Sequence, residues 1–253
     1  MPETAPAFFN GPQGRLAYER LDGAGPGLVW LGGFKSDMTG TKATFLGDWA
    51  RERARAFLRF DYSGHGASEG VFEEGCISDW AADALALFDA LTEGPQILVG
   101  SSMGGWIAGL LALRRPEKIA GIVFIAPAPD FTETLMWEQM IAETREKLMR
   151  EGRIEEPSDY SDEPTVITKK LIEDGRRNLI LGGPVAITAP VRILQGMADP
   201  DVPWTHALKF AEALETGDVE ITLTKTGDHR LSAPEDLERL ARAVEGLSGG
   251  IRA

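Results

Sequence analysis

Short apolar runs alternate with amphipathic stretches along most of the chain. Apolar runs bounded by turn residues are typical of buried strands, and they lie at 27–31, 56–60, 96–100, 119–126, 191–194 and 219–224. Apolar residues at helical spacing predict helices at 41–53, 77–91, 103–113, 204–214 and 234–247. Residues 7–10 and 15–21, with glycines in the turn between them, predict two antiparallel edge strands. This order is typical of a largely parallel sheet covered by helices.

The alternation is interrupted at 127–189, a stretch too long for an ordinary connection between a helix and a strand. It contains a helical pattern at 135–150, a polar turn at 155–164 and a second helical pattern at 165–174. We therefore expect 127–189 to form a helical cap, inserted into a core made of 1–126 and 190–253.

The composition excludes several classes of partner. Of the 253 residues, 43% are hydrophobic, which is enough to bury the core of one large domain. The formal net charge is −13 and no Lys/Arg cluster occurs, whereas a nucleic-acid partner requires a basic face. No apolar stretch is long enough to cross a membrane, and residues 1–20 carry no targeting pattern. We expect a soluble, cytoplasmic protein with no nucleic-acid partner and no stable membrane insertion.

Cys76 is the only cysteine, so an intramolecular disulfide is excluded. A reactive thiolate needs a neighbouring base or cation, and the sequence around Cys76 offers no obvious base. We expect Cys76 to be a small core or boundary residue that precedes a helix.

The strongest local signal for chemistry is the run from Gly100 to Gly104, which matches Gly-x-Ser-x-Gly with Ser102 at its centre. It directly follows a predicted buried strand and directly precedes a predicted helix, as a nucleophile elbow does. A sharp strand-to-helix turn crowds the residues two positions either side of the serine, and Gly100 and Gly104 relieve that crowding. The pattern predicts that Ser102 is a catalytic nucleophile.

A serine nucleophile needs a general base, and the chain has three histidines. His65 precedes Ser102 in sequence, whereas a fold with this elbow places its histidine last, so we expect it to support a turn. His206 lies within a predicted helix, where a surface or packing role is usual. His229 lies between the last predicted strand and the last helix, at the same edge of the sheet as the elbow. We therefore predict that His229 is the base.

The histidine needs a carboxylate to fix its tautomer. Asp199 follows the predicted strand 191–194, which places it at the edge of the sheet near His229. Asp201, two residues further along, and Asp130, after the preceding strand, remain alternatives. We predict Asp199 as the acid.

Acyl transfer also needs two donors for the oxyanion. The backbone N–H of the residue after the nucleophile is one of them, here Met103. The loop Leu31-Gly32-Gly33-Phe34-Lys35-Ser36 follows a buried strand, and its glycines allow the backbone to approach a substrate. We predict that the Phe34 amide is the second donor.

Together these motifs resemble the α/β-hydrolase superfamily over nearly the whole chain. A closer resemblance, to the abhydrolase domain-containing protein 10 family, rests on several further segments. These are Gly40-Thr41-Lys42-Ala43, Arg59-Phe60-Asp61-Tyr62-Ser63-Gly64, Gly94-Pro95-Gln96-Ile97-Leu98-Val99-Gly100-Ser101-Ser102, Arg115-Pro116-Glu117-Lys118, Val202-Pro203-Trp204, Asp228-His229-Arg230 and Pro157-Ser158-Asp159-Tyr160-Ser161.

The resemblance implies an α/β-hydrolase fold with an eight-stranded, mostly parallel sheet and a helical cap. It also implies the triad Ser102, Asp199 and His229 and the activity of that family, palmitoyl-protein thioesterase and acyl-glucuronide esterase. Two departures from the family pattern stand out. Many superfamily members have His-Gly where this chain has Gly32-Gly33, and residues 1–20 do not resemble the transit peptide of the mitochondrial enzyme.

The cap offers candidate substrate contacts. Met136, Trp137 and Met140 can line one cap face, and Trp204 lies near the end of a core element. Flexible methionine side chains suit acyl chains of variable shape. The alternative is that each of these residues packs the cap onto the core.

The leading hypothesis is a serine hydrolase of carboxylic esters or thioesters that needs no metal and no organic cofactor. Its substrate would be a small-molecule or lipid-acyl ester or thioester, including an S-acylated protein. The same triad also serves carbon–carbon bond hydrolases and acyltransferases. A hypothesis from another class is a non-catalytic hydrolase homologue that binds a ligand.

Overall fold

One sheet organises the described part of the molecule. The computed structural model describes residues 5–157 and 164–249, and within them eight strands form a sheet in the order β1-β2-β4-β3-β5-β6-β9-β10. The strands are β1 (Ala7–Gly11), β2 (Gly14–Leu21), β3 (Ala24–Leu31), β4 (Arg55–Phe60), β5 (Gln96–Ser101), β6 (Ile119–Ile125), β9 (Val191–Gly196) and β10 (Val219–Thr224). β1 and β2 form an antiparallel pair at one edge, and all neighbours from β4 to β10 are parallel. The expected α/β fold with a mostly parallel sheet is confirmed.

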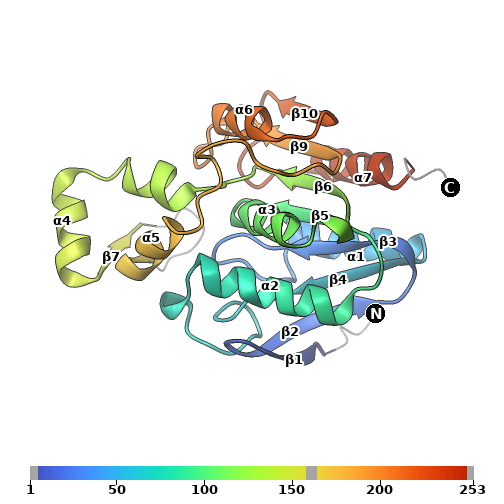
Figure 1. Ribbon diagram of the computed structural model, residues 1–253, viewed down its shortest axis with the longest axis horizontal. Helices are drawn as coiled ribbons and strands as arrows, with labels where there is room; N and C mark the ends of the chain where they lie inside the picture. The colour runs from blue at the N-terminus through green and yellow to red at the C-terminus, as the bar shows by residue number, and fades with distance from the viewer. Residues whose placement is uncertain (1–4, 158–163, 250–253) are drawn as a thin grey trace.

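Helices cover both faces of this sheet (Figure 1). They are α1 (Thr41–Glu52), α2 (Ile77–Leu91), α3 (Met103–Arg114), α6 (Trp204–Ala213) and α7 (Pro234–Ser248), with two short turns, η1 (Phe72–Glu74) and η2 (Pro116–Lys118). In β5, Leu98 packs with residues of α2, α3 and α6, while Ile97 and Val99 pack with α1 and α7. Successive strand residues point to opposite faces, so one apolar run supplies both cores.

A long insertion, residues 126–190, separates β6 from β9 and extends away from the sheet (Figure 1). Its elements are η3 (Thr132–Trp137), a π-helical turn, then α4 (Ala142–Glu151), β7 (Arg153–Glu156), β8 (Thr165–Thr168) and α5 (Lys169–Gly175). Leu148, Ile154, Ile167 and Ile172 form a small apolar cluster of its own. The boundaries of core and cap at 126/127 and 189/190 stay a prediction.

The expected elements of the insertion need correction. The single helix expected at 135–150 is two helical segments, because the chain turns at 138–141 between η3 and α4. The helix expected at 165–174 begins with the strand β8, whose sequence Thr-Val-Ile-Thr is β-branched and pairs antiparallel with β7. Most of the polar turn expected at 155–164, and the segment Ser158-Asp159-Tyr160-Ser161, lie outside the described residues.

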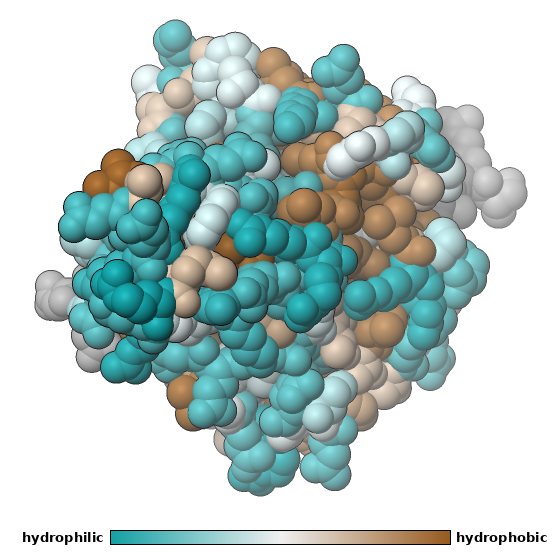
Figure 2. Space-filling model, turned by 60° about the vertical axis from the view of Figure 1, so that its left-hand side comes forward, coloured by the Kyte–Doolittle hydropathy of each residue, from teal (hydrophilic) through white to brown (hydrophobic). Residues whose placement is uncertain are grey.

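The outer surface of the insertion is largely polar. Leu148 is the buried residue of α4, while Met149 is 37% exposed and Ile141, just before the helix, is 67% exposed. With the insertion turned towards the viewer, the surface is mainly hydrophilic and has one larger apolar area to its side (Figure 2). In the described residues, no helix combines the length and apolar character needed to cross a membrane.

One buried carboxylate joins the insertion to the core, and a second ties the two ends of the insertion to each other. Asp174 in α5 accepts hydrogen bonds from the Ser78 amide and hydroxyl of α2, each at 2.8 Å, and from the Asn178 amide at 3.2 Å. Asp130, at the start of the insertion, accepts hydrogen bonds from the amides of Ile180 and Leu181, both at 2.8 Å. The two ends of the insertion are therefore held by buried charge-assisted hydrogen bonds.

We expect Asp174→Ala to lower the free energy of unfolding by about 2–4 kcal/mol, because the amide and the hydroxyl of Ser78 lose their acceptor. The melting temperature should fall by roughly 5–10 °C in thermal unfolding followed by circular dichroism. The matched control is Glu173→Ala, which removes an exposed partner of Lys169 and should change the melting temperature little. Equal melting temperatures for the two variants would contradict the role of Asp174.

Candidate active site

Ser102 lies in the sharp turn that joins β5 to α3. Its backbone angles are φ 54° and ψ −120°, a left-handed conformation that is costly for a residue other than glycine. The turn is held in place because the Ser102 amide donates to the Ile125 carbonyl at 2.9 Å and the Ser102 carbonyl accepts from the Gly105 amide at 2.8 Å. The strained backbone exposes the serine side chain at the carboxyl end of the central strand.

The two glycines of the motif are required by backbone crowding. A Cβ on Gly100 would lie 2.4 Å from the Gly104 carbonyl oxygen, and a Cβ on Gly104 would lie 2.0 Å from the Leu31 carbonyl oxygen. Both contacts are with backbone atoms, which cannot turn aside as a flexible side chain can. The predicted crowding within the turn is confirmed for Gly100, whereas Gly104 is required by the close approach of the end of β3.

The loops after β9 and β10 bring an acid and a base to Ser102. His229 Nε2 lies 3.0 Å from the Ser102 Oγ, and His229 Nδ1 lies 2.8 Å from Asp199 Oδ2. The Asp199 side chain has no exposed surface, and the His229 side chain is 16% exposed. Three strands that are far apart in sequence therefore assemble a continuous Ser–His–Asp chain at one edge of the sheet.

Hydrogen bonds keep the buried Asp199 carboxylate ionised. Burial alone would raise its pKa, but the hydrogen bond and charge of His229 and the amides of Val202 and Asp201 lower that pKa below its ordinary value. Asp199 Oδ1 accepts from the Asp201 amide at 2.8 Å and from the Val202 amide at 2.9 Å. A carboxylate with a lowered pKa is an anion at neutral pH and can stabilise an imidazolium.

Gln195 also contacts the Asp199 carboxylate and is not among the site residues predicted from the sequence. Its Nε2 lies 3.2 Å from Asp199 Oδ2, the oxygen that contacts His229, and 3.0 Å from the Val202 carbonyl oxygen. The Gln195 side chain is completely buried. The signal in the sequence is a polar residue that directly follows the apolar pair Ile193-Leu194 in β9 and needs a buried partner.

The two alternative acids lie in different places. The Asp130 carboxylate holds the backbone at Ile180 and Leu181. Asp201 is exposed, and its carboxylate belongs to a group with Asp199 and His229 whose ligand atoms lie within 4.8 Å of one another. Such a group has donor types that suit a metal ion, but Asp199 Oδ2 and His229 Nδ1 are already hydrogen-bonded to each other.

The other two histidines pack in the core and are uncharged near neutral pH. Burial lowers the pKa of His65 to about 4, and its Nδ1 lies 3.1 Å from the Ser63 carbonyl oxygen. The His206 Nε2 lies 2.8 Å from the Pro129 carbonyl oxygen, and burial lowers its pKa as well. Both fit the structural roles expected for them.

The loop after β3 lies against Ser102. A Cβ on Gly33 would be 3.5 Å from the Ser102 Cβ, and the loop is closed because the Ser36 amide and hydroxyl donate to the Gly33 carbonyl at 3.2 and 2.8 Å. In residues 5–157 and 164–249, neither the Phe34 amide nor the Met103 amide donates to a protein acceptor. Two unused N–H groups are thus available beside Ser102, and their role as an oxyanion hole stays a prediction.

Aromatic side chains surround this loop. The Phe34 ring makes edge contacts with Phe72 at 4.8 Å, Phe131 at 5.7 Å and Trp80 at 5.8 Å between ring centroids. Phe131 belongs to the insertion, and its ring also lies 5.7 Å from Trp106 of α3. The loop is therefore packed between the core and the insertion, with an apolar wall beside it.

The four expected substrate contacts lie in different surroundings. Met136, Trp137 and Met140 pack against the apolar cluster of the insertion, and Trp204 is the half-buried first residue of α6. The Trp137 ring has guanidinium groups at 4.5 and 5.4 Å from its centroid, contributed by the insertion's own arginines. Packing within the insertion accounts for Trp137, and substrate contact by these four residues stays a prediction.

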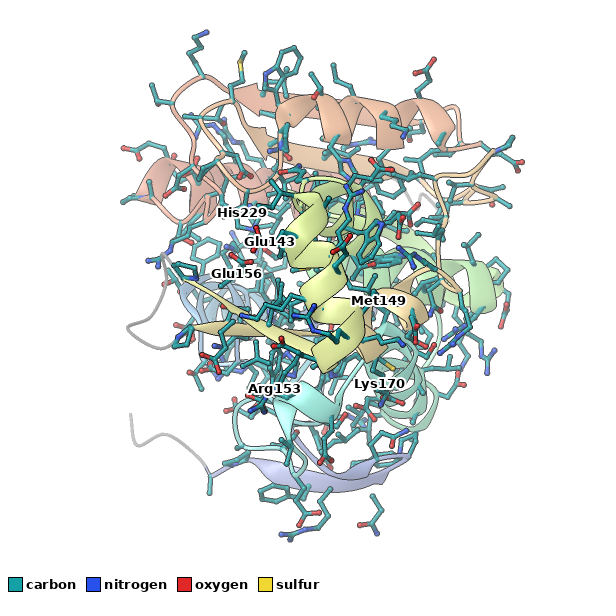
Figure 3. The ribbon with its side chains drawn as sticks, turned by 90° about the vertical axis from the view of Figure 1, so that its left-hand side faces the viewer. Glu143, Met149, Arg153, Glu156, Lys170 and His229 are labelled. Carbon is teal, nitrogen blue, oxygen red and sulfur yellow. The ribbon has the colours of Figure 1, made fainter. Side chains whose placement is uncertain are left out.

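The labelled side chains show how the insertion lies relative to the base. With the insertion facing the viewer, α4 and β7 lie in front of the sheet (Figure 3). His229 is seen past the end of α4 that carries Glu143, whereas Met149 is further along that helix (Figure 3). In this view the insertion lies in front of the side of the sheet on which His229 is seen (Figure 3).

Known proteins match this chain in sequence and in structure. The family model Hydrolase_4, described as serine aminopeptidase, S33, matches residues 33–176. A Bos taurus protein named palmitoyl-protein thioesterase ABHD10, mitochondrial, is 37% identical over 247 residues, which cover 97% of this chain and 80% of that protein. The solved mouse alpha/beta hydrolase domain-containing protein 10 has a TM-score of 0.90 at 36% identity, and covers 96% of this chain and 98% of its own. A putative hydrolase from Agrobacterium vitis S4 has a TM-score of 0.92 at 45% identity, with 96% and 98% coverage.

These comparisons correct the expected location. The lack of a targeting pattern in residues 1–20 predicts a cytoplasmic protein. That prediction is wrong, since the curated relatives from cattle, mouse and human that match nearly the whole chain are mitochondrial proteins. A missing targeting pattern was therefore not a sound basis for a location.

We expect Gly104→Ala to displace Ser102 and to slow its reaction with a fluorophosphonate probe by about 100-fold, as a shift of about 1 Å does at an active site. The cause is the contact that a new Cβ would make with the Leu31 carbonyl oxygen. The rate of covalent labelling, followed by mass spectrometry, measures it. Gly246→Ala in α7 is the control, because a Cβ there meets nothing within 4 Å. Unchanged labelling of Gly104→Ala would show that the turn tolerates a side chain.

Proposed function

This chain belongs to the α/β-hydrolase family, and on that premise we propose that it is a serine hydrolase of esters or thioesters with Ser102, His229 and Asp199 as its triad. The observation that carries the proposal is the unbroken chain of contacts, 3.0 Å from Ser102 to His229 and 2.8 Å from His229 to Asp199. This arrangement activates a serine because each group orients and polarises the next.

The proposed reaction has two halves. Ser102 Oγ attacks the acyl carbonyl carbon while His229 Nε2 accepts the hydroxyl proton, and the Phe34 and Met103 amides donate to the oxyanion. The carbon–oxygen or carbon–sulfur bond then breaks, and His229 returns the proton to the leaving alcohol or thiol. Water attacks the acyl-enzyme in the second half, with His229 again accepting the proton, and the carboxylic acid is released as Ser102 is restored. Asp199 stabilises the imidazolium in both halves.

For the substrate we propose a medium-to-long acyl ester or thioester, with S-acylated proteins among the candidates. The support is twofold. The curated relatives that match nearly the whole chain are named palmitoyl-protein thioesterases. In addition, Phe34 lies in the loop against Ser102 and packs with Phe131 of the insertion, which provides apolar surface for an acyl chain. Met136, Trp137, Met140 and Trp204 are proposed as further substrate contacts.

Replacement of the triad residues should abolish turnover without unfolding the protein. We expect Ser102→Ala and His229→Ala each to lower kcat by at least about 1000-fold, in line with triad knockouts elsewhere. Steady-state hydrolysis of a thioester, with circular dichroism to confirm folding, measures this. His206→Ala is not expected to reach that loss, because its ring contacts the Pro129 carbonyl oxygen. Near-normal kcat in the Ser102 or His229 variant would refute the triad.

A chain-length series tests the substrate class. We expect kcat/KM to rise by about tenfold or more from acetyl to octanoyl thioesters, because each methylene that becomes buried contributes about 0.8 kcal/mol. Matched thioesters, simple esters and acyl glucuronides, assayed at subsaturating concentration, separate acyl preference from leaving-group preference. A preference for acetyl over octanoyl and longer acyl groups would rule out the proposed acyl specificity while leaving the triad intact.

A further inference from the structure

A lysine from a distant helix contacts the loop that carries the base. Lys42 lies in the first turn of α1, and its ammonium donates hydrogen bonds to the Arg230 carbonyl oxygen and, at 3.4 Å, to the Ser232 Oγ. Both acceptors belong to the loop between β10 and α7, and Arg230 directly follows His229. The contact therefore acts on the backbone next to the catalytic imidazole.

The surroundings of Lys42 are unfavourable for a cation. The amino-terminal end of a helix carries a positive partial charge, which repels the ammonium. A cavity of about 10 Å³ beside Lys42 has a largely apolar lining that includes Leu194, Leu231 and Leu240. A charge in such surroundings is costly unless favourable interactions offset its loss of hydration. The hydrogen bonds to the loop are such interactions.

The same loop is fixed at its other end by different contacts. The Gly227 carbonyl accepts a hydrogen bond from the Ala198 amide at 3.0 Å, which ties the loop to the segment before Asp199. Leu231 has a strained φ of 43°, and its amide donates to the Asp228 carboxylate at 2.9 Å. His229 thus lies between an anchor at residue 227 and the Lys42 contacts at residues 230 and 232.

We propose that Lys42 is a positioning residue, which holds the Arg230 carbonyl and the Ser232 hydroxyl so that His229 Nε2 stays within hydrogen-bond distance of Ser102 Oγ. The proposal rests on the proposed triad, since it assigns Lys42 a role in orienting its base. Lys42 touches neither the substrate nor the reacting atoms. It acts through the backbone of the loop.

The charge of Lys42 changes within a measurable pH range. Burial, assisted by the charge of Arg230, lowers the pKa of Lys42 to about 8, against the attraction of Asp228 and Asp236. Arg239, which also lines the cavity, forms an ion pair with Asp236 at 2.8 Å and reduces that attraction. Lys42 is an ammonium below about pH 8 and a neutral amine above it, and a neutral amine is a weaker donor. The hydrogen bonds from Lys42 to the loop are therefore charge-assisted below about pH 8 and lose that assistance as the pH rises above it.

The test compares kcat, KM and pH profile in the wild type, Lys42→Met and Lys42→Arg. We expect Lys42→Met to lower kcat and the rate of fluorophosphonate labelling by about tenfold. This loss is smaller than that expected when a reacting group is displaced by about 1 Å. KM should change by less than about threefold. The wild type should lose kcat above about pH 8, and Lys42→Met should lack this alkaline decrease. Lys42→Arg keeps its charge, so it should recover part of kcat and move the alkaline decrease to higher pH.

Two controls separate an effect of the substitution on folding from an effect on activity. Replacement of a buried charge by methionine is expected to leave the melting temperature unchanged or raise it, so a loss of kcat would not reflect unfolding. Lys118→Met is the control variant, since Lys118 pairs with Asp89 at 3.1 Å on the surface, and it should keep wild-type kcat and pH profile.

The outcomes distinguish the two proposals. A wild-type protein that does not react with the fluorophosphonate probe would overturn the triad itself. A reactive wild type together with a Lys42→Met variant that keeps kcat and the alkaline decrease would overturn the positioning role alone. If Lys42→Met does not fold, an alkaline decrease at the same pH in Lys42→Arg and in the wild type would also overturn it.

Discussion

The strained backbone of Ser102 is the constraint on which the rest of the site depends. A positive φ at a serine is unfavourable, and it persists because the surrounding chain fixes the turn from several sides. The Ser102 amide donates to β6, and the Ser102 carbonyl accepts from the first turn of α3. The backbone at the end of β3 lies in close contact with Gly104. The end of β3 lies so close to Gly104 that only glycine fits there, and the loop that follows brings Phe34 beside Ser102. The packing of β3 against the turn therefore accounts both for the glycine and for the position of the proposed oxyanion donor.

The proposed base and acid depend on a second level of support. The Asp199 side chain is completely buried, yet it stays ionised because backbone amides and His229 donate to it. His229 is then oriented from three directions, by Asp199, by Ser102 and through the backbone of its own loop. Each contact is a modest hydrogen bond, but together they leave the imidazole little freedom, which is what general-base catalysis needs.

The sequence predicted the sheet and the elbow because their signals are local and strong: the run from Gln96 to Gly104 combines a buried strand, a glycine-flanked serine and a helix start. His229 and Asp199 were chosen by elimination and by their place after a strand, and the structure brings both to Ser102. The insertion was predicted less well, since β8 is only four residues long and a strand of that length shows no clear periodicity. Lys42 and Gln195 were missed for a different reason. The role of Lys42 arises from a contact with a segment more than a hundred residues away, which no local pattern shows. The polar Gln195 is visible in the sequence of β9, but its partner is set by how the loop after β9 folds.

The pairing of β6 with β9 has an evolutionary consequence. These strands are hydrogen-bonded neighbours, with Ile125 opposite Leu194, although the whole insertion separates them in sequence. The pairing of β6 with β9 does not depend on the length of the chain between them, and the insertion reaches the elbow mainly at its start, where the Ala128 amide donates to the Ser102 carbonyl at 3.2 Å. Changes further along the insertion can therefore alter what reaches Ser102 while the strand pairing stays the same, so specificity and the proposed chemistry can change separately.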